Sequence, residues 1–207
     1  MTIYTVDKLR KEIMSKLSGK RLSHILSVER EIEWLGMHLL PHELLRLKTA
    51  ALLHDNTKDI PDSEQAALCD RLGITLSEQE RACPQILHAK SGAFTAKNVY
   101  GAYSDDGIVQ AITYHTTASP HMTFFDRLLF MADFAEKERK WDRCKQIRAE
   151  LHEMPVNAPL FEKRAYFDRV FLHCLALKSE YIVLTDWPAD KQTLEALEAF
   201  TNRFRSI

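Results

Sequence analysis

One stretch decides the expected fold of this chain: Lys48-Thr-Ala-Ala-Leu-Leu-His54-Asp55-Asn-Thr-Lys58-Asp59. It begins as an apolar helical segment and ends abruptly in polar and charged side chains. Its apolar residues continue a pattern of three- and four-residue steps from Leu44, so one face of the predicted helix should enter a core. His54 and Asp55 then lie at the inner end of that helix, where an unpaired charge is costly and a bound cation would remove the cost. A single His-Asp pair is weak evidence by itself, so the rest of the chain must supply further ligands.

The composition is typical of a globular protein with a substantial core. Of the 207 residues, 45% are hydrophobic and 28% are charged, and the formal net charge is -1. This charge gives no global reason to expect binding to nucleic acid or to an anionic membrane. The small numbers of glycines (six) and prolines (seven) favour helices over a turn-rich β design.

The cysteines and the hydropathy pattern predict a cytoplasmic protein. The four cysteines are widely scattered without C-x-x-C spacing, which predicts reduced and mostly buried thiols. The N-terminal residues include no apolar segment of signal-peptide length. No run approaches the roughly 18 to 20 apolar residues of a membrane span. We therefore expect no membrane partner and no nucleic-acid partner.

Capping and breaking residues divide the chain into helices and predict an all-α fold. Helix N-caps are expected at Thr5, Ser63 and Thr123, and a capping box at Ser77 with Glu80. The expected helices span about residues 5–18, 20–39, 41–55, 63–71, 77–83, 85–100, 106–116, 124–138, 143–153, 160–179 and 189–204, and residues 181–185 form the single expected strand.

Five of the expected helices each carry a group that can bind a metal ion. Asp133 is the most informative, because it lies in the apolar run 128–135, where an ionised carboxylate needs a cation, a hydrogen-bond network or a metal. Singly, Asp133 could be half of a buried salt bridge, and each histidine could be a hydrogen-bonded core residue. Together, one group per helix predicts a mixed imidazole and carboxylate shell suited to iron, manganese or zinc. The candidate ligands are His24, His54, Asp55, His88, His115 and Asp133.

The order of these residues resembles the HD-domain metal-dependent phosphohydrolases. Short sequence segments between about residues 20 and 150 are similar to those of the YqeK family, the bacterial symmetrical diadenosine-tetraphosphate hydrolases. The segments that carry the similarity are Arg21-Leu-Ser-His24, Leu53-His-Asp-Asn-Thr-Lys58, His88-Ala-Lys-Ser-Gly-Ala93, Tyr114-His-Thr-Thr117 and Met131-Ala-Asp-Phe134. The resemblance implies an HD-domain helical bundle over residues 1–155, with residues 156–207 as a C-terminal helical extension packed on the same domain.

The resemblance also implies a dinuclear metal site, usually iron, with manganese, zinc or another ion as alternatives. The implied ligands form two sets that share Asp55 as a bridge: His24, His54, Asp55 and Asp133 for one ion, and Asp55, His88 and His115 for the other. Two close metals would share a water, lower its pKa and present hydroxide to a phosphorus atom. The implied reaction cleaves diadenosine tetraphosphate symmetrically into two ADP, with Asp55 and Lys58 as catalytic residues.

Basic residues at family positions are implied clamps for the substrate phosphates. Lys58, Arg139 and Arg148 suit this role, arginine through paired donors and lysine as a point charge. A solvated surface charge is the alternative for each. Asp59 could orient Lys58 or a histidine, although a surface role is favoured for it. Trp141, between the two arginines, is the best candidate for stacking on a base.

This chain departs from the family pattern in two places. A Gly-Arg-Pro-Gly-like loop is replaced by Ala118-Ser-Pro-His121, which removes an arginine and the glycines that allow a backbone to approach phosphate. A stretch with proline and glycine after Asp133 is replaced by Lys137-Glu-Arg-Lys-Trp141-Asp-Arg. His121 could substitute for the lost donor as a substrate-binding residue, with a surface role as the alternative.

These departures leave three hypotheses open. The first is symmetrical cleavage of a dinucleoside polyphosphate. The second keeps the phosphohydrolase chemistry but changes the substrate to another nucleotide or phosphoester. The third is a nucleotide-sensing HD protein without useful turnover. All three predict a nucleotide-like small molecule as partner, and the oligomeric state is open, with a homodimer as one alternative.

Overall fold

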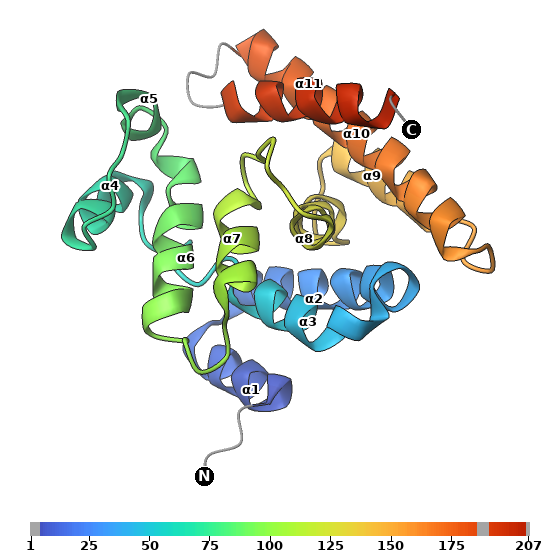
Figure 1. Ribbon diagram of the computed structural model, residues 1–207. Helices are drawn as coiled ribbons and strands as arrows, with labels where there is room; N and C mark the ends of the chain where they lie inside the picture. Colours follow the sequence, from blue (N-terminus) through green and yellow to red (C-terminus); the bar gives the residue numbers. More distant parts are fainter. Residues whose placement is uncertain (1–4, 186–190, 206–207) are drawn as a thin grey trace.

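The computed structural model describes residues 5–185 and 191–205, in which every regular element is a helix (Figure 1). The α-helices are α1 (Val6–Lys16), α2 (Gly19–Leu39), α3 (Leu44–Leu53), α4 (Asp62–Arg71), α5 (Glu78–Arg81), α6 (His88–Asn98), α7 (Asp106–Tyr114), α8 (Phe124–Ala135), α9 (Asp142–His152), α10 (Leu160–Thr185) and α11 (Lys191–Arg205). The short 3-10 helices η1 (Pro41–Glu43) and η2 (Pro84–Ile86) lead into α3 and α6. The predicted all-α fold class is confirmed.

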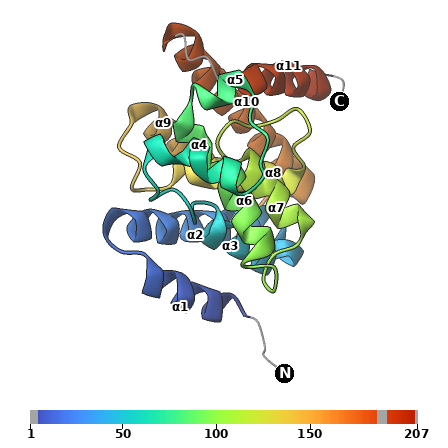
Figure 2. The ribbon, with the colours of Figure 1, turned by 90° about the vertical axis from the view of Figure 1, so that its left-hand side faces the viewer.

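The helices are stacked so that those carrying the predicted ligands meet. Helix α1 packs on α3, and α2 packs against both α3 and α8. Helix α7 packs against α3, α6 and α8. In both ribbon views, α8 lies between the α2–α3 pair and the α10–α11 pair (Figures 1 and 2). Helices α2, α3, α6, α7 and α8 therefore surround one region of the interior.

One large hydrophobic core connects the first helix to the last. Leu9 of α1, Leu52 of α3 and Leu129 of α8 are fully buried in it, and so are Phe171 of α10 and Phe200 of α11. Full burial of such a side chain stabilises the fold by about 1.5–3 kcal/mol. The C-terminal helices thus share the core of the N-terminal ones, while the boundary between residues 155 and 156 stays a prediction.

Most of the predicted helix starts are confirmed. The hydroxyl of Thr5 accepts from Lys8 N, and capping boxes are present at Ser77 and at Thr123. The predicted cap at Ser63 is wrong. Helix α4 begins one residue earlier, at Asp62, with Pro61 in the N-cap position, so Ser63 lies inside the first turn.

Two other predictions are corrected by the structure. Residues 181–185 are not a strand but the last turn and a half of α10, which continues unbroken from Leu160 to Thr185. Helix α8 ends at Ala135 and not near 138, because Glu136 leaves the helical conformation (φ -58°, ψ 153°). Residues 186–190, which include the predicted start of the last helix, lie outside the described residues.

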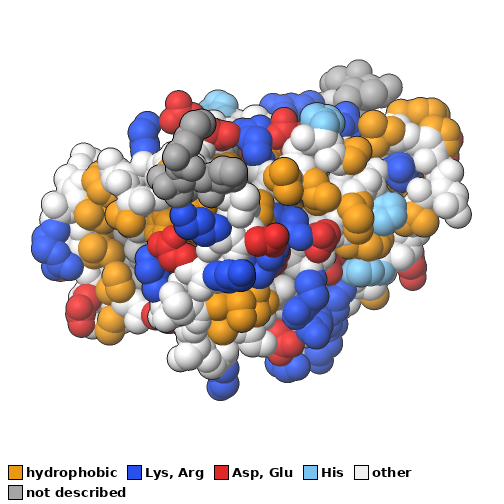
Figure 3. All heavy atoms as spheres, turned by 90° about the horizontal axis from the view of Figure 1, so that it is seen from below, with side chains coloured by type: hydrophobic (Ala, Val, Ile, Leu, Met, Phe, Trp, Pro, Cys, Tyr) orange, Lys and Arg blue, Asp and Glu red, His pale blue; other side chains and the backbone are white. Residues whose placement is uncertain are grey.

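The surface and the cysteines agree with the composition. On the face seen in Figure 3, basic and acidic side chains are intermixed, as expected for a net charge of -1. All four cysteines are buried free thiols, as predicted: Cys69, Cys83, Cys144 and Cys174. Among the described residues, no helix is both long enough and apolar enough to pass through a bilayer.

Candidate dinuclear metal centre

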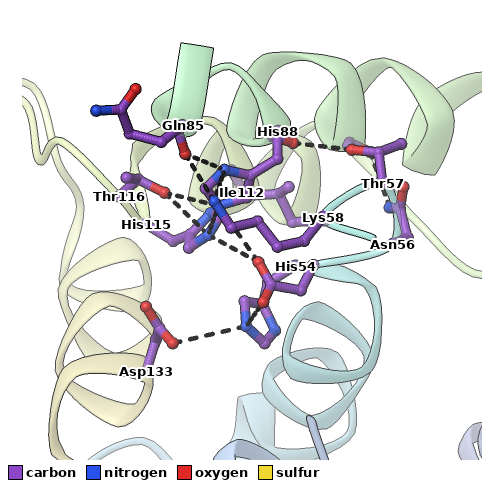
Figure 4. A network of polar contacts seen from close by, with 12 residues as sticks. His54, Asn56, Thr57, Lys58, Gln85, His88, Ile112, His115, Thr116 and Asp133 are labelled. Atoms are coloured by element: carbon purple, nitrogen blue, oxygen red, sulfur yellow. Dashed lines mark hydrogen bonds and ion pairs between the residues drawn. The ribbon is translucent and has the colours of Figure 1, made fainter. Parts of the chain in front are cut away.

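The six predicted ligands are brought together by the ends and inner faces of five helices. His54 and His115 are the C-cap residues that follow α3 and α7, and His88 begins α6, while His24 lies within α2 and Asp133 within α8. In Figure 4, the labelled His54, His88, His115 and Asp133 point toward one another from their separate helices. Five of the six ligands are buried residues, and the side chains of His24 and Asp133 expose 12% and 13% of their surface.

The turn after His54 is tied to α6 by hydrogen bonds. Asn56 donates to the carbonyls of Leu53 and Gly92, and the Thr57 hydroxyl donates to the His88 carbonyl at 3.2 Å (Figure 4). A Cβ at Gly92 would lie 3.3 Å from the His54 carbonyl oxygen, so glycine allows α6 to approach the turn closely. These contacts hold His54 and His88 on adjacent sides of the site.

The donor atoms form two groups. In the first group, the Nε2 atoms of His24 and His54 are 3.2 Å apart, and the Asp133 Oδ1 atom lies 3.1 Å and 3.7 Å from them. In the second group, the Nε2 atoms of His88 and His115 are also 3.2 Å apart. Two imidazole nitrogens at this separation can both bind the same cation, so each histidine pair suits one metal ion.

Asp55 joins the two groups through its two carboxylate oxygens. Its Oδ2 atom lies 3.5 Å and 3.6 Å from the Nε2 atoms of His24 and His54. Its Oδ1 atom lies 3.3 Å and 3.6 Å from the Nε2 atoms of His88 and His115. A carboxylate that offers one oxygen to each histidine pair is the arrangement of a bridging ligand.

Each histidine is oriented by a hydrogen bond at its other ring nitrogen. The Nδ1 atoms of His54, His88 and His115 each lie 2.7–2.8 Å from the backbone carbonyl three residues earlier. The Nδ1 atom of His24 lies 3.1 Å from Oε1 of Glu136. In a neutral ring, such bonds place the proton on Nδ1 and leave Nε2 as a lone-pair donor, which is the usual support of a metal-binding histidine.

The protonation states of these groups also fit a metal site. Burial lowers the pKa of His54 to about 4 and that of His88 to about 3, so both rings are neutral near pH 7. The pKa of Asp55 lies well below its usual range, because the surrounding histidines outweigh the opposing effect of burial. Arg139 and His24 outweigh burial in the same way at Asp133. Neutral imidazoles and ionised carboxylates are the forms that bind metals.

His24 reports the excess negative charge of the centre. Burial by itself would lower the pKa of this imidazole, but the carboxylates of Asp133, Asp55 and Glu136 outweigh it and raise the pKa to about 11. Three carboxylates in a largely buried space attract cations, and among the protein's own groups His24, Arg21 and Arg139 supply positive charge. The donor set and its charge therefore fit two divalent metal ions.

A cavity lined by five lysines and arginines and by five carboxylates opens onto the centre, and we call it the basic cavity after its cations. Its volume is about 790 Å³, and Lys58, Arg139 and the ligands His24, Asp55 and Asp133 line it. The Nζ atom of Lys58 donates to the Gln85 carbonyl at 2.8 Å and lies 3.3 Å from His88 Nδ1. Burial lowers the pKa of Lys58. Arg139 donates to Oδ1 of Asp133 at 2.6 Å.

The structure places two other predicted substrate-binding residues away from this cavity. Arg148 donates to the carbonyls of Ala135 and Glu136, where it satisfies the C-terminal end of α8. His121 is exposed in the loop before α8, and neither side chain lines the cavity. Asp59 accepts from Arg21 at 3.1 Å, so it positions this arginine and not Lys58.

Sequence reasoning missed three residues of the site. Arg21 pairs with Asp55, Glu136 supports His24, and the Thr116 hydroxyl lies 3.2 Å and 3.1 Å from the Nε2 atoms of His88 and His115. Arg21 belongs to the quoted segment 21–24 and Thr116 to the quoted segment 114–117, so their positions were a usable signal. Glu136 belongs to no motif, and only its buried side chain identifies it.

Comparison with known proteins identifies the family. The model of the HD domain family matches residues 21–159, which is more than half of the chain. The fold and the paired histidine and aspartate ligands agree with this match. The chain belongs to the HD domain family, which confirms the resemblance seen in the sequence.

Individual relatives carry more specific names. The chain is 29% identical, over 107 residues, to a symmetrical bis(5'-nucleosyl)-tetraphosphatase of Halalkalibacterium halodurans, a match that spans 51% of this chain and 55% of that protein. It is 28% identical to the protein of the same name from Staphylococcus aureus, over 78% of this chain and 79% of the relative. The first match thus spans little more than half the length of that relative.

One solved structure has the same fold over nearly the whole chain. It is a Clostridium acetobutylicum protein described as a predicted HD superfamily hydrolase involved in NAD metabolism. The TM-score is 0.79 at 23% sequence identity, and the match covers 98% of this chain and 100% of the other. At this identity the likeness shows the fold alone.

Proposed function

We propose that this protein is a metal-dependent phosphohydrolase that cleaves diadenosine tetraphosphate symmetrically into two ADP. The observation that carries the proposal is the position of Asp55 in the lining of the basic cavity, with one carboxylate oxygen near each of two histidine pairs. The names of the relatives support the choice of substrate. Iron is the proposed metal, with manganese or zinc as alternatives for the same donor set.

The residues of the centre would divide the work of hydrolysis between metal binding and phosphate binding. His24, His54 and Asp133 would hold one ion and His88 with His115 the other, with Asp55 between them. Two ions so held lower the pKa of a water molecule and neutralise phosphate oxygens. Hydrolysis forms a bond between the water oxygen and one of the two central phosphorus atoms. The bond from that phosphorus to the bridging oxygen breaks, and this oxygen leaves with the second ADP.

Cations on two sides of the cavity suit a polyphosphate chain. Lys58 and Arg21 lie beside Asp55, and Arg139 lies beside Asp133 on the opposite helix. A phosphate chain that displaces these ion pairs would gain charge-assisted hydrogen bonds from the same groups. The Thr116 hydroxyl, which lies next to His88 and His115, can donate a further hydrogen bond to a phosphate oxygen.

The altered loop at residues 118–121 motivates another phosphoester as the alternative substrate. The loop lies under the C-terminal helix: the Pro120 carbonyl accepts from Arg203, and the Thr117 carbonyl accepts from Thr193. Its residues do not line the basic cavity. This placement supports the first substrate over the alternative, because the loop changes leave the cavity walls intact. The buried thiols are compatible with the reducing cytoplasm, which we propose as the location.

The test is chromatography of the products that iron- or manganese-loaded protein forms from diadenosine tetraphosphate. ADP as the sole nucleotide product is the expected result. Asp55→Asn, which keeps the shape of the side chain, should lose metal binding and turnover together. ATP with AMP would contradict symmetrical cleavage, and a protein that holds two metals per chain but forms no product would contradict the substrate. A panel of other phosphoesters would then test the alternative.

A further inference from the structure

A second and smaller cavity adjoins the metal centre. Its volume is about 250 Å³, and it shares Ile86, Thr116, Asp133 and Arg139 with the basic cavity. The two cavities therefore meet beside the ligand Asp133. The other lining residues of the smaller cavity are five aromatic and aliphatic side chains, Phe130, Phe134, Trp141, Tyr181 and Ile182, together with His115, Cys144 and Lys178.

The aromatic residues of this cavity are held in place by their neighbours. The ring centroids of Trp141 and Tyr181 are 5.2 Å apart at an interplanar angle of 73°, and Phe134 lies 6.3 Å from Trp141. The Arg143 guanidinium lies 5.5 Å from the indole centroid. Trp141 nevertheless exposes 43% of its surface. A fixed, half-exposed indole at the rim of an apolar cavity provides a flat surface on which a planar ring can stack.

The basic cavity has a different character. Its described lining contains charged and small polar side chains and one isoleucine, but no phenylalanine, tyrosine or tryptophan. Lys20 and Lys140 add two cations to its lining, and Asp59 and Glu138 add two carboxylates. The cations can pair with phosphate groups, whereas the described lining offers a second base no large aromatic ring on which to stack.

We infer that the smaller cavity binds one nucleobase of the substrate against Trp141, and that the basic cavity recognises only the phosphate chain. The volume supports this assignment, because ligand pockets for whole drug-sized molecules have about 300–1,000 Å³, whereas this cavity is large enough for a single base. The inference rests on the proposed function, and it extends the substrate class to nucleoside 5'-polyphosphates that lack a second nucleoside. Adenosine 5'-tetraphosphate would then be hydrolysed to ADP and pyrophosphate.

Binding measurements test the base subsite independently of turnover. In calorimetric titrations of the metal-loaded protein, one ADP per chain should bind more tightly than pyrophosphate. Trp141→Ala should weaken ADP binding about tenfold, in line with the loss of one stacked base, and leave pyrophosphate binding unchanged. Trp141→Phe should retain most of the affinity. The matched control is Phe161→Ala, an aromatic residue that is 72% exposed at the start of α10 and lines neither cavity.

Three results of these titrations would overturn the subsite. The first is equal affinity for ADP and pyrophosphate. The second is a Trp141→Ala protein that binds ADP as tightly as the unchanged chain, or that loses pyrophosphate binding to the same degree. The third is two ADP molecules bound per chain with equal affinity, since that would require a second base site.

Turnover measurements test the one-sided recognition. The kcat/KM for adenosine 5'-tetraphosphate should lie within about fivefold of the value for diadenosine tetraphosphate, because no stacking contact is lost with the second base. A loss of about 100-fold would show that the second nucleoside is recognised and would overturn the inference. If neither compound is cleaved but ADP binding depends on Trp141, the proposed function fails and the base subsite stands. If both are cleaved and Trp141→Ala changes neither ADP affinity nor KM, the subsite fails and the proposed function stands.

Discussion

Glu136 shows at the scale of one residue how the protein supports its metal centre. The side chain is 1% exposed, its Oε1 atom lies 3.1 Å from His24 Nδ1, and its Oε2 atom accepts from Glu138 N at 2.6 Å. Helix α8 ends just before it, so the carboxylate turns back toward α2. Its contribution is to fix the His24 ring and to raise the basicity of that ligand.

We therefore expect Glu136→Gln to lower metal affinity by about 10- to 100-fold, which is the usual effect of losing such a partner. The substitution keeps the size of the side chain, so the fold should be retained. Titration with Mn²⁺ measures the affinity, and circular dichroism reports the helix content.

Glu150→Gln is the matched control for this prediction. Glu150 makes the same kind of contact, 2.8 Å to His173 Nδ1, but on α9, outside both cavities that meet at the metal centre. Its substitution should leave metal affinity unchanged. Equal affinities for Mn²⁺ in Glu136→Gln and in the unchanged chain would show that His24 is oriented without Glu136.

The residue scale also shows what the sequence could and could not predict of the site. The six ligands were predictable because each is a polar residue beside an apolar segment, and they lie on five of the expected helices, with the adjacent pair at 54–55 on one of them. The supports were not, because Gln85, Ala51 and Ile112 act through backbone carbonyls that any residue would supply. Arg148 was assigned to phosphate from the family resemblance, whereas its actual contacts depend on where α8 ends.

Helix α10 is the element in which local sequence and tertiary structure differ most. Residues 181–185 are β-branched or aromatic at several positions and predict a strand when they are considered alone. They directly follow the helical residues 160–180, and α10 contains no glycine or proline that would end the helix before them. Ile182 is buried and Tyr181 contacts Trp141, so packing favours the helical continuation.

The same helix provides a test of the shared core. Phe171 is fully buried among other aromatic rings. Its ring centroid lies 5.9 Å from that of Phe130 and 5.1 Å from that of Phe200. Phe171→Ala should lower the free energy of unfolding by about 3–5 kcal/mol, because it leaves a cavity where α8, α10 and α11 meet. Phe161→Ala, at an exposed position of α10, should change it by less than about 0.5 kcal/mol. Urea denaturation measures both. Equal effects would mean that the C-terminal helices do not contribute to the common core.

At the scale of the whole molecule, the fold and the site depend on each other. The five helices that carry ligands pack into the one hydrophobic core, and that core concentrates the carboxylates of Asp55, Asp133 and Glu136 in a largely buried space. Among the protein's own groups, Arg21, His24 and Arg139 offset this charge. A bound cation would offset it more directly, so metal binding should stabilise the entire chain.

This coupling predicts a large effect of metal on thermal stability. A ligand that binds only the folded state, at 1,000 times its Kd, contributes about 4 kcal/mol. For a chain of this size each kcal/mol raises Tm by about 2–4 °C, so saturation should raise Tm by roughly 10 °C over chelated protein. Asp55→Asn should abolish this increment. Asp168→Asn, which breaks the ion pair with Arg127 between α8 and α10, should lower both Tm values and keep the difference between them. Identical melting curves for the metal-loaded and chelated protein would show that the carboxylates are balanced by the protein's own cations alone.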